Sequence, residues 1–298
     1  MWLLLAFVSA ALLGFYDVAK KRALRDNAVP QVLLLNTLFS TLLFLPLLIS
    51  SQAGFDWFDG TRFAFEPQGF RAHVLIAIKS VIVLSSWLFG YFGLKHLPLT
   101  IVGPINATRP VMVLMGAFLI FAERLNWMQW VGVVLALVSI FLLSRAGKKE
   151  GINFAHNRWI FCIAAAAVLG AASGLYDRRI MRELDPLFVQ SWYNLYQLGM
   201  MALAVACIVV LQPNRTRFRW SWAIPMISIL LSAADMAYFT ALAEQEAMIS
   251  VVSMIRRSSV VVSFACGALI LHEKNLRTKA IDLVLILIGM IFLYLGSR

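Results

Sequence analysis

Basic side chains stand inside long apolar runs at two places in the sequence. Arg109 follows Asn106 within the segment 104–110, which also contains two prolines, and Arg256 is followed directly by Arg257. An ionisable group in an apolar span costs about 3 kcal/mol or more, so each arginine is a candidate functional residue. A guanidinium group binds a carboxylate or phosphate through two parallel hydrogen bonds. The pattern predicts a site for an anionic or zwitterionic solute.

The two consecutive arginines are not expected to play the same part. Neighbouring residues on a helix point about 100° apart, so only one of them can be centred on a cavity. The other needs an acidic neighbour or a route to the lipid headgroups. We favour Arg257 over Arg256 for the position facing the solute.

Internal charge pairing is the alternative role for these cations. Aspartates lie in the same apolar runs or at their ends, and they could neutralise the arginines and Lys79 with no contact to a solute. The aspartates are Asp17, Asp177 and Asp235. The sequence leaves direct solute contact and internal pairing both open.

The same aspartates are the candidates for coupling or gating. Asp17 and Asp177 close equivalent Gly-x-Tyr-Asp sequences and are followed by basic residues, so each is expected to cap or gate its helix end, or to form an ion pair there. Asp235 follows Ser-Ala-Ala in a deeper apolar run. A buried carboxyl group can carry a proton, and we predict this role for Asp235, with Lys79 as its partner.

Polar and aromatic side chains are concentrated in the run 187–211. Trp192 and Tyr196 share one helix face at a spacing of four residues, and Tyr193 and Gln197 share the next. Such a wall suits recognition of a planar or amphipathic solute. An aromatic belt at the membrane interface is an equal alternative.

Composition requires a bilayer around these residues. The 298-residue chain is 61% hydrophobic and only 14% charged, and its mean hydropathy is +0.81, so it has more apolar surface than a soluble core could bury. Its net charge of +11 comes from basic residues between apolar runs, which is the pattern of membrane topology and not of nucleic-acid binding. The three cysteines have no metal-binding or disulfide spacing. We expect no nucleic-acid partner, no metal and no cofactor.

Ten apolar runs are long enough to be transmembrane helices. They lie near 2–20, 31–50, 74–94, 98–121, 126–144, 158–180, 187–211, 221–242, 247–271 and 279–296. Lys and Arg counts at the helix ends place both termini outside, although the bias is weak. Gly170 and Gly174 share one helix face, as do Ala10 and Gly14, and this spacing predicts close helix packing.

The chain contains an internal duplication. Residues 11–24 align with 171–184, and residues 100–124 align with 250–274 without a gap. The repeats, 1–146 and 155–298, would each cross the membrane five times, and an odd number of crossings makes the second repeat inverted. The sequence therefore predicts an all-α membrane protein with ten transmembrane helices as two inverted five-helix repeats. Inverted repeats around a midplane site are a recurrent transporter architecture.

The chain resembles the EamA type of the drug/metabolite transporter superfamily. The resemblance rests on the ten runs, the five-helix repeat and an acid-base pair after the fourth and ninth runs, Glu123-Arg124 and Glu273-Lys274. It implies that helices 1 to 4 and 6 to 9 surround a cavity while helices 5 and 10 pack outside. It also implies cytoplasmic termini, against the charge count, and transport in the export direction. Arg256-Arg257 is similar in place and charge to a Lys-Arg pair in the plastid sugar-phosphate carriers of this superfamily.

These observations and the resemblance predict a secondary active transporter in a bacterial inner membrane. It would export a small metabolite across that membrane by alternating access. An amino acid, an organic acid or a sugar phosphate is the expected solute, with a coupling proton or counter-substrate, and the protein is a monomer or homodimer. Proton-coupled export of cationic or amphipathic drugs is the alternative, followed by lipid handling. Catalysis is not expected, because the four histidines are scattered near loops without convergent partners.

Overall fold

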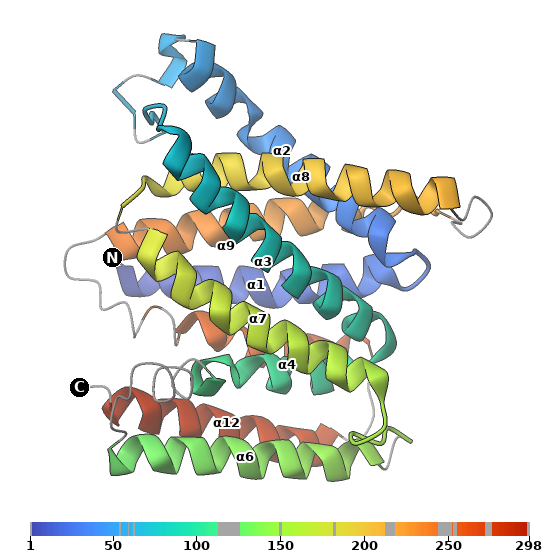
Figure 1. Ribbon diagram of the computed structural model, residues 1–298. Helices are drawn as coiled ribbons and strands as arrows, with labels where there is room; N and C mark the ends of the chain where they lie inside the picture. The colour runs from blue at the N-terminus through green and yellow to red at the C-terminus, as the bar shows by residue number, and fades with distance from the viewer. Residues whose placement is uncertain are drawn as a thin grey trace.

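The computed structural model describes residues 2–53, 55–58, 60–61, 63–112, 126–148, 151–180, 183–211, 218–243, 252, 255–271 and 276–296. The regular elements within these ranges are all helices (Figure 1). The predicted all-α class is therefore confirmed. The Glu-basic pairs at 123–124 and 273–274 lie outside the described residues.

The helices follow the predicted apolar runs closely. The first half contains α1 (Trp2–Leu24), α2 (Val29–Ala53), the short 3-10 helix η1 (Asp56–Phe58), α3 (Phe70–His96), α4 (Leu99–Ala107) and α6 (Trp127–Lys148). The second half contains α7 (Arg158–Ile180), α8 (Pro186–Leu211), α9 (Ala223–Ala243), α11 (Ser259–Leu269) and α12 (Leu276–Gly296). Within the described residues, six helices are long and apolar enough to cross a membrane, namely α1, α2, α3, α6, most of α7 and most of α12.

Each main helix pair joins one helix from the first half of the chain to one from the second. α1 packs against α9, α3 against α7, α2 against α8, α4 against α11, and α6 against α12. α6 and α12 lie side by side at one edge of the bundle, and α2 and α8 cross near the opposite edge (Figure 1). α1 begins and α12 ends at the same end of the bundle. The two halves are interleaved and do not form separate bodies.

The outer surface of the bundle is apolar, unlike that of a soluble protein. Large apolar side chains such as Phe7, Leu137 and Phe141 are exposed on the outside. Polar side chains such as Asn36 and Gln197 are buried between helices. A surface of this kind is stable against lipid tails, and the buried polar groups mark the helix interfaces.

Two of the predicted continuous runs are broken. α4 ends at Ala107, Thr108 forms a turn, and 109–112 are helical again. Residues 255–257 are helical, Ser258 forms a turn, and α11 begins at Ser259. The prediction of unbroken helices over 98–121 and 247–271 is wrong at these points. In α4 the reason is Pro110, which has no N–H to donate to the carbonyl of Asn106.

The two breaks have the same hydrogen bonds. The Thr108 hydroxyl donates to the Ile105 carbonyl at 2.7 Å, and the Ser258 hydroxyl donates to the Ile255 carbonyl at 2.6 Å. The backbone N–H groups of Thr108 and Ser258 donate to the same carbonyls, at 3.2 and 3.0 Å. A hydroxyl that bonds to the carbonyl three residues earlier competes with the helix ladder, so a single turn of tighter geometry replaces it.

Candidate functional site

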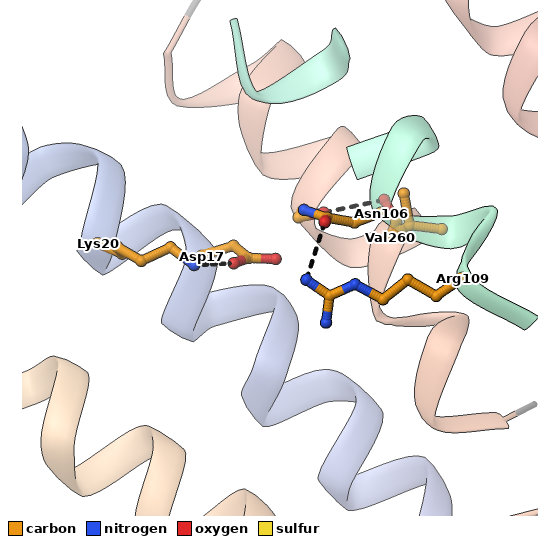
Figure 2. A network of polar contacts seen from close by, with 6 residues as sticks. Asp17, Lys20, Asn106, Arg109 and Val260 are labelled. Atoms are coloured by element: carbon orange, nitrogen blue, oxygen red, sulfur yellow. Dashed lines mark hydrogen bonds and ion pairs between the residues drawn. The ribbon is translucent and has the colours of Figure 1, made fainter. Parts of the chain in front are cut away.

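Arg109 lies directly after the break in α4. Its Nη2 donates to the Asn106 side-chain oxygen at 3.1 Å, across the turn (Figure 2). The guanidinium rests against Gly170 of α7, where a Cβ atom would come within 2.6 Å of the Arg109 Cζ. Its Nε is buried without a hydrogen-bond partner. Arg109 is therefore held in position by the Asn106 side-chain amide and by contact with α7 at Gly170. Its Nε remains as a donor without a partner among the described residues.

Asp17 on α1 faces this break. Its carboxylate accepts from Lys20 at 2.8 Å and points from α1 toward Asn106 and Arg109 (Figure 2). Lys20 also lies 4.3 Å above the ring centroid of Tyr16 and 5.2 Å from that of Tyr91. Of the alternatives that the sequence leaves open for Asp17, the ion pair with a following basic residue is present, about two turns before the end of α1. Arg109 interacts with Asp17 electrostatically, but the carboxylate bonds to the lysine.

Arg256 is neutralised within the protein. Its Nη2 forms an ion pair with the Asp235 carboxylate of α9, and its Cζ lies 4.1 Å from the ring centroid of Tyr238 on the same helix. The predicted partnership of Asp235 with Lys79 is wrong, because Arg256 is nearer to Asp235 in the folded chain. Internal pairing explains Arg256.

Lys79 has a different carboxylate. Its Nζ forms an ion pair with Asp177 on α7 and lies 5.3 Å from the ring centroid of Tyr193 on α8. Lys79 is buried, as its pairing requires, and the contact joins α3, α7 and α8. Asp177 is the repeat counterpart of Asp17, yet its base comes from a neighbouring helix and not from its own.

Arg257 makes no hydrogen bond and no ion pair with a described residue. It lies close enough to Arg109 and Arg256 to interact with both electrostatically. Five cations of this region, Lys20, Lys79, Arg109, Arg256 and Arg257, thus meet three carboxylates, Asp17, Asp177 and Asp235. Of these five cations, Arg109 and Arg257 form no ion pair with a carboxylate of a described residue.

These charges belong to one interior region. Tyr193 of α8 lies near Asp235 of α9, Asp177 of α7 and Arg256, and Tyr16 of α1 lies near Tyr193. Tyr16 and Tyr91, which sequence reasoning did not select, are both buried here. Tyr16 could have been found, because it stands in the duplicated Gly-x-Tyr-Asp sequence; Tyr91 has no such signal.

The polar wall on α8 divides into two parts. Trp192 and Tyr196 pack together as predicted, with ring centroids 5.8 Å apart. Both meet His73 of α3, whose Nδ1 is 2.9 Å from the Tyr196 hydroxyl. Sequence reasoning had assigned His73 to a loop. Tyr193 and Gln197 are buried, and neither amide atom of Gln197 has a hydrogen-bond partner.

The predicted small-residue packing holds at one of the two stripes. Gly14 lies directly against the Val262 side chain and the Ser259 carbonyl of α11. Gly170 instead makes room for the Arg109 side chain, and a Cβ at Gly174 would meet no atom within 4 Å. The Gly170–Gly174 stripe therefore accommodates a charged side chain and does not serve as a helix-packing motif.

Comparison with known proteins identifies the family. The model of the EamA-like transporter family matches residues 1–145 and again residues 157–295. The chain belongs to the EamA-like transporter family. An uncharacterized transporter from Archaeoglobus fulgidus is 24% identical over 156 residues, which span 49% of each chain, so the match covers about half the length of that relative.

The fold is also found among solved structures. A protein crystal structure superposes with a TM-score of 0.62 at 18% sequence identity, over 98% of this chain and 97% of the other. At that identity the likeness concerns the fold alone. Together with the apolar helices, membership of the EamA-like transporter family makes the protein a multi-pass membrane protein.

Proposed function

We propose that the protein is a secondary active transporter for a small anionic or zwitterionic metabolite, such as an amino acid, an organic acid or a sugar phosphate. The observation that carries this proposal is the presence of two guanidinium groups, Arg109 and Arg257, that hold no carboxylate, beside three cations that do. Like charges held together in an apolar bundle repel each other, and a bound carboxylate or phosphate removes that cost. The solute would be the missing counter-charge.

The proposed architecture is a pair of inverted five-helix repeats, 1–146 and 155–298. The pairing of helices supports it, because α1 meets α9 while its counterpart α7 meets α3, and α2, α4 and α6 each meet their own counterparts. The equivalent breaks at Thr108 and Ser258 support it independently, since both lie within the duplicated blocks. Broken helices at corresponding positions are where transporters with inverted repeats bind their substrates.

The remaining site residues then have distinct roles. Asn106 orients Arg109, and Tyr193, Gln197, Trp192 and Tyr196 would supply the polar and aromatic side of the solute site. Asp17 with Lys20 and Asp177 with Lys79 are ion pairs in the C-terminal parts of the equivalent helices α1 and α7, which inverted repeats would place on opposite sides of the membrane. Breaking one pair and keeping the other would open the cavity to one side at a time, which is alternating access. The ion pair of Arg256 with Asp235 connects the helix break at Ser258 to α9 and holds the two helices in position.

Direction and setting follow from the family resemblance. Export across a bacterial inner membrane is proposed, by a monomer or a homodimer. The coupling is to a proton or a counter-solute.

The test is thermal stabilisation of the purified full-length protein by a solute panel. Amino acids, organic acids, sugar phosphates, nucleosides and cationic drugs are added to the wild type, to Arg109→Ala and to Arg257→Ala. Arg145→Ala is the matched control, because Arg145 is an exposed arginine that lies against the ring of Phe141 on α6. A ligand that binds only the folded state raises the melting temperature, and the rise grows with the logarithm of the ligand concentration above its dissociation constant.

The expected result is stabilisation by an anionic or zwitterionic compound in the wild type and in Arg145→Ala, and its loss in both cavity variants. Flux of that compound into proteoliposomes then checks transport. Stabilisation by cationic or neutral compounds alone, equal in all four proteins, would overturn the solute class and favour drug export.

A further inference from the structure

One acidic side chain in the membrane-spanning bundle stands apart from the paired charges. Asp282 lies in the second turn of α12 and is fully buried. The Ser139 hydroxyl of α6, itself fully buried, donates to the Asp282 Oδ1, and the Oδ2 has no partner. Asp17, Asp177 and Asp235 each hold a base, whereas Asp282 forms no ion pair with a described residue.

Asp282 is fully buried, and no charged side chain of the described residues forms an ion pair with it. α6 and α12 approach so closely that a Cβ on Gly132 would come within 2.8 Å of the Gly289 carbonyl. α6 carries Arg145 and Lys148 beyond Ser139, both exposed, at the end of α6 that lies beside the start of α12. α4 has no titratable side chain between Leu99 and Ala107. On α12 itself Arg277 is exposed, and the Lys279 Nζ donates to the Thr100 hydroxyl at 2.9 Å.

An ionised carboxylate with one bare oxygen in such a place is costly, and the free energy falls when the bare oxygen carries a proton. We propose that Asp282 is a proton-binding site at the α6–α12 interface, protonated on Oδ2 and separate from the arginine cavity. Release leaves the carboxylate of Asp282 and delivers the proton to water at the end of the bundle where α12 begins. Lys279, one turn earlier on the same helix, is then the neighbouring cation that the new charge would attract.

The position links this proton to the helix break in α4. Lys279 bonds to Thr100 at the start of α4, and Leu283, Ile286 and Met290 of α12 form a cluster with Ala107, the last residue of α4. A charge change at Asp282 therefore acts on α12, which contacts both the first and the last turn of α4. Such a site suits a coupling proton, and the sequence-based candidate Asp235 suits that role less because it already holds Arg256.

Infrared spectroscopy of the full-length protein in lipid nanodiscs tests the proposal without any solute. A protonated carboxylic acid gives a C=O stretch that a carboxylate lacks. The wild type is expected to show this band at neutral pH, and the band is expected to shrink reversibly as the pH is raised. Asp282→Asn removes the band, while the control Asp17→Asn, which alters an ion-paired acid, keeps it.

A second variant keeps the acid and guards against misfolding of Asp282→Asn. Ser139→Ala removes the hydroxyl that donates to the Asp282 Oδ1, so the C=O stretch is expected to move to higher frequency with its intensity retained. Three results would overturn the proposal: no band in the wild type, a band that persists in Asp282→Asn, or a band that does not respond to pH. An unshifted band in Ser139→Ala would also overturn it, because the protonated acid would then lie elsewhere.

Discussion

The breaks at Thr108 and Ser258 have the same backbone but opposite charge arrangements. In each, a hydroxyl and an N–H share the carbonyl of an isoleucine three residues earlier. At the first break the arginine follows the turn and bonds only to an amide, Asn106. At the second the arginines precede the turn, and Arg256 pairs with the carboxylate of Asp235 while Arg257 pairs with no carboxylate of a described residue.

The two repeats therefore share the backbone geometry of the helix break but differ in the charged side chains around it. Asn106 stands where the second repeat has Arg256, so one repeat supplies a neutral hydrogen-bond acceptor and the other a cation that needs an acid. A paired arginine contributes to the fold, and an unpaired one is available to a solute. The following experiments separate these two kinds of arginine.

Asp235→Asn is expected to have the largest effect. It leaves the Arg256 guanidinium, on a side chain that is 18% exposed, without its carboxylate, and breaking a buried pair on one side costs about 3 kcal/mol. Thermal unfolding in detergent should show a large fall in melting temperature. The double variant Asp235→Asn/Arg256→Gln should recover most of it; unchanged stability in the single variant would mean that the pair does not stabilise the fold.

Arg109→Ala should leave the melting temperature of the solute-free protein nearly unchanged, because no carboxylate loses its partner. Binding of the anionic compound found in the panel should weaken by about 2 kcal/mol, roughly thirtyfold. The measurement is the concentration dependence of thermal stabilisation. Arg109→Lys should recover part of the affinity, since it restores the charge but not the two-pronged geometry. A loss of stability as large as that of Asp235→Asn would contradict the distinction between the two arginines.

Gly170→Ala should act on the solute through Arg109. The added methyl would stand 2.6 Å from the Arg109 Cζ, so the flexible side chain must leave its position, at about 1 kcal/mol of binding free energy. Gly174→Ala, one turn further on α7 with open space around it, is the matched control and should bind normally. Equal affinities in the two variants would show that the position of Arg109 is unimportant to binding.

Thr108→Val and Ser258→Ala should have the smallest effects. Each removes one hydroxyl donor from a carbonyl that keeps its backbone donor, so the expected loss is about 0.5 kcal/mol of stability. If the breaks are equivalent, the two variants lower the melting temperature by the same amount. A clear difference between them would show that one break depends on its hydroxyl and the other on a feature such as Pro110.

The positions of the helices and the family could be predicted from the sequence, because apolar runs of bilayer length and duplicated blocks can be recognised in the chain without its fold. The break at Thr108 had a signal in Pro110, and its counterpart at Ser258 could have been inferred by transferring that break through the duplication. Asp282 lies inside the last predicted apolar run, so its position in a span could be predicted. Nothing nearby in the sequence indicates that it forms no ion pair. The contact of Gly170 with Arg109 and that of His73 with Tyr196 had no sequence signal at all.

The sequence by itself determined that the chain is an all-helical membrane protein, and it singled out the arginines, aspartates and α8 side chains that a transporter of this family could use. Only the tertiary structure decided which charge meets which. Lys79 pairs with Asp177 and Arg256 pairs with Asp235, while Arg109 and Arg257 form no ion pair within the described part of the chain. The reason is physical: hydrophobic length is a property of one segment, whereas an ion pair depends on which helices pack together and how each is rotated about its axis.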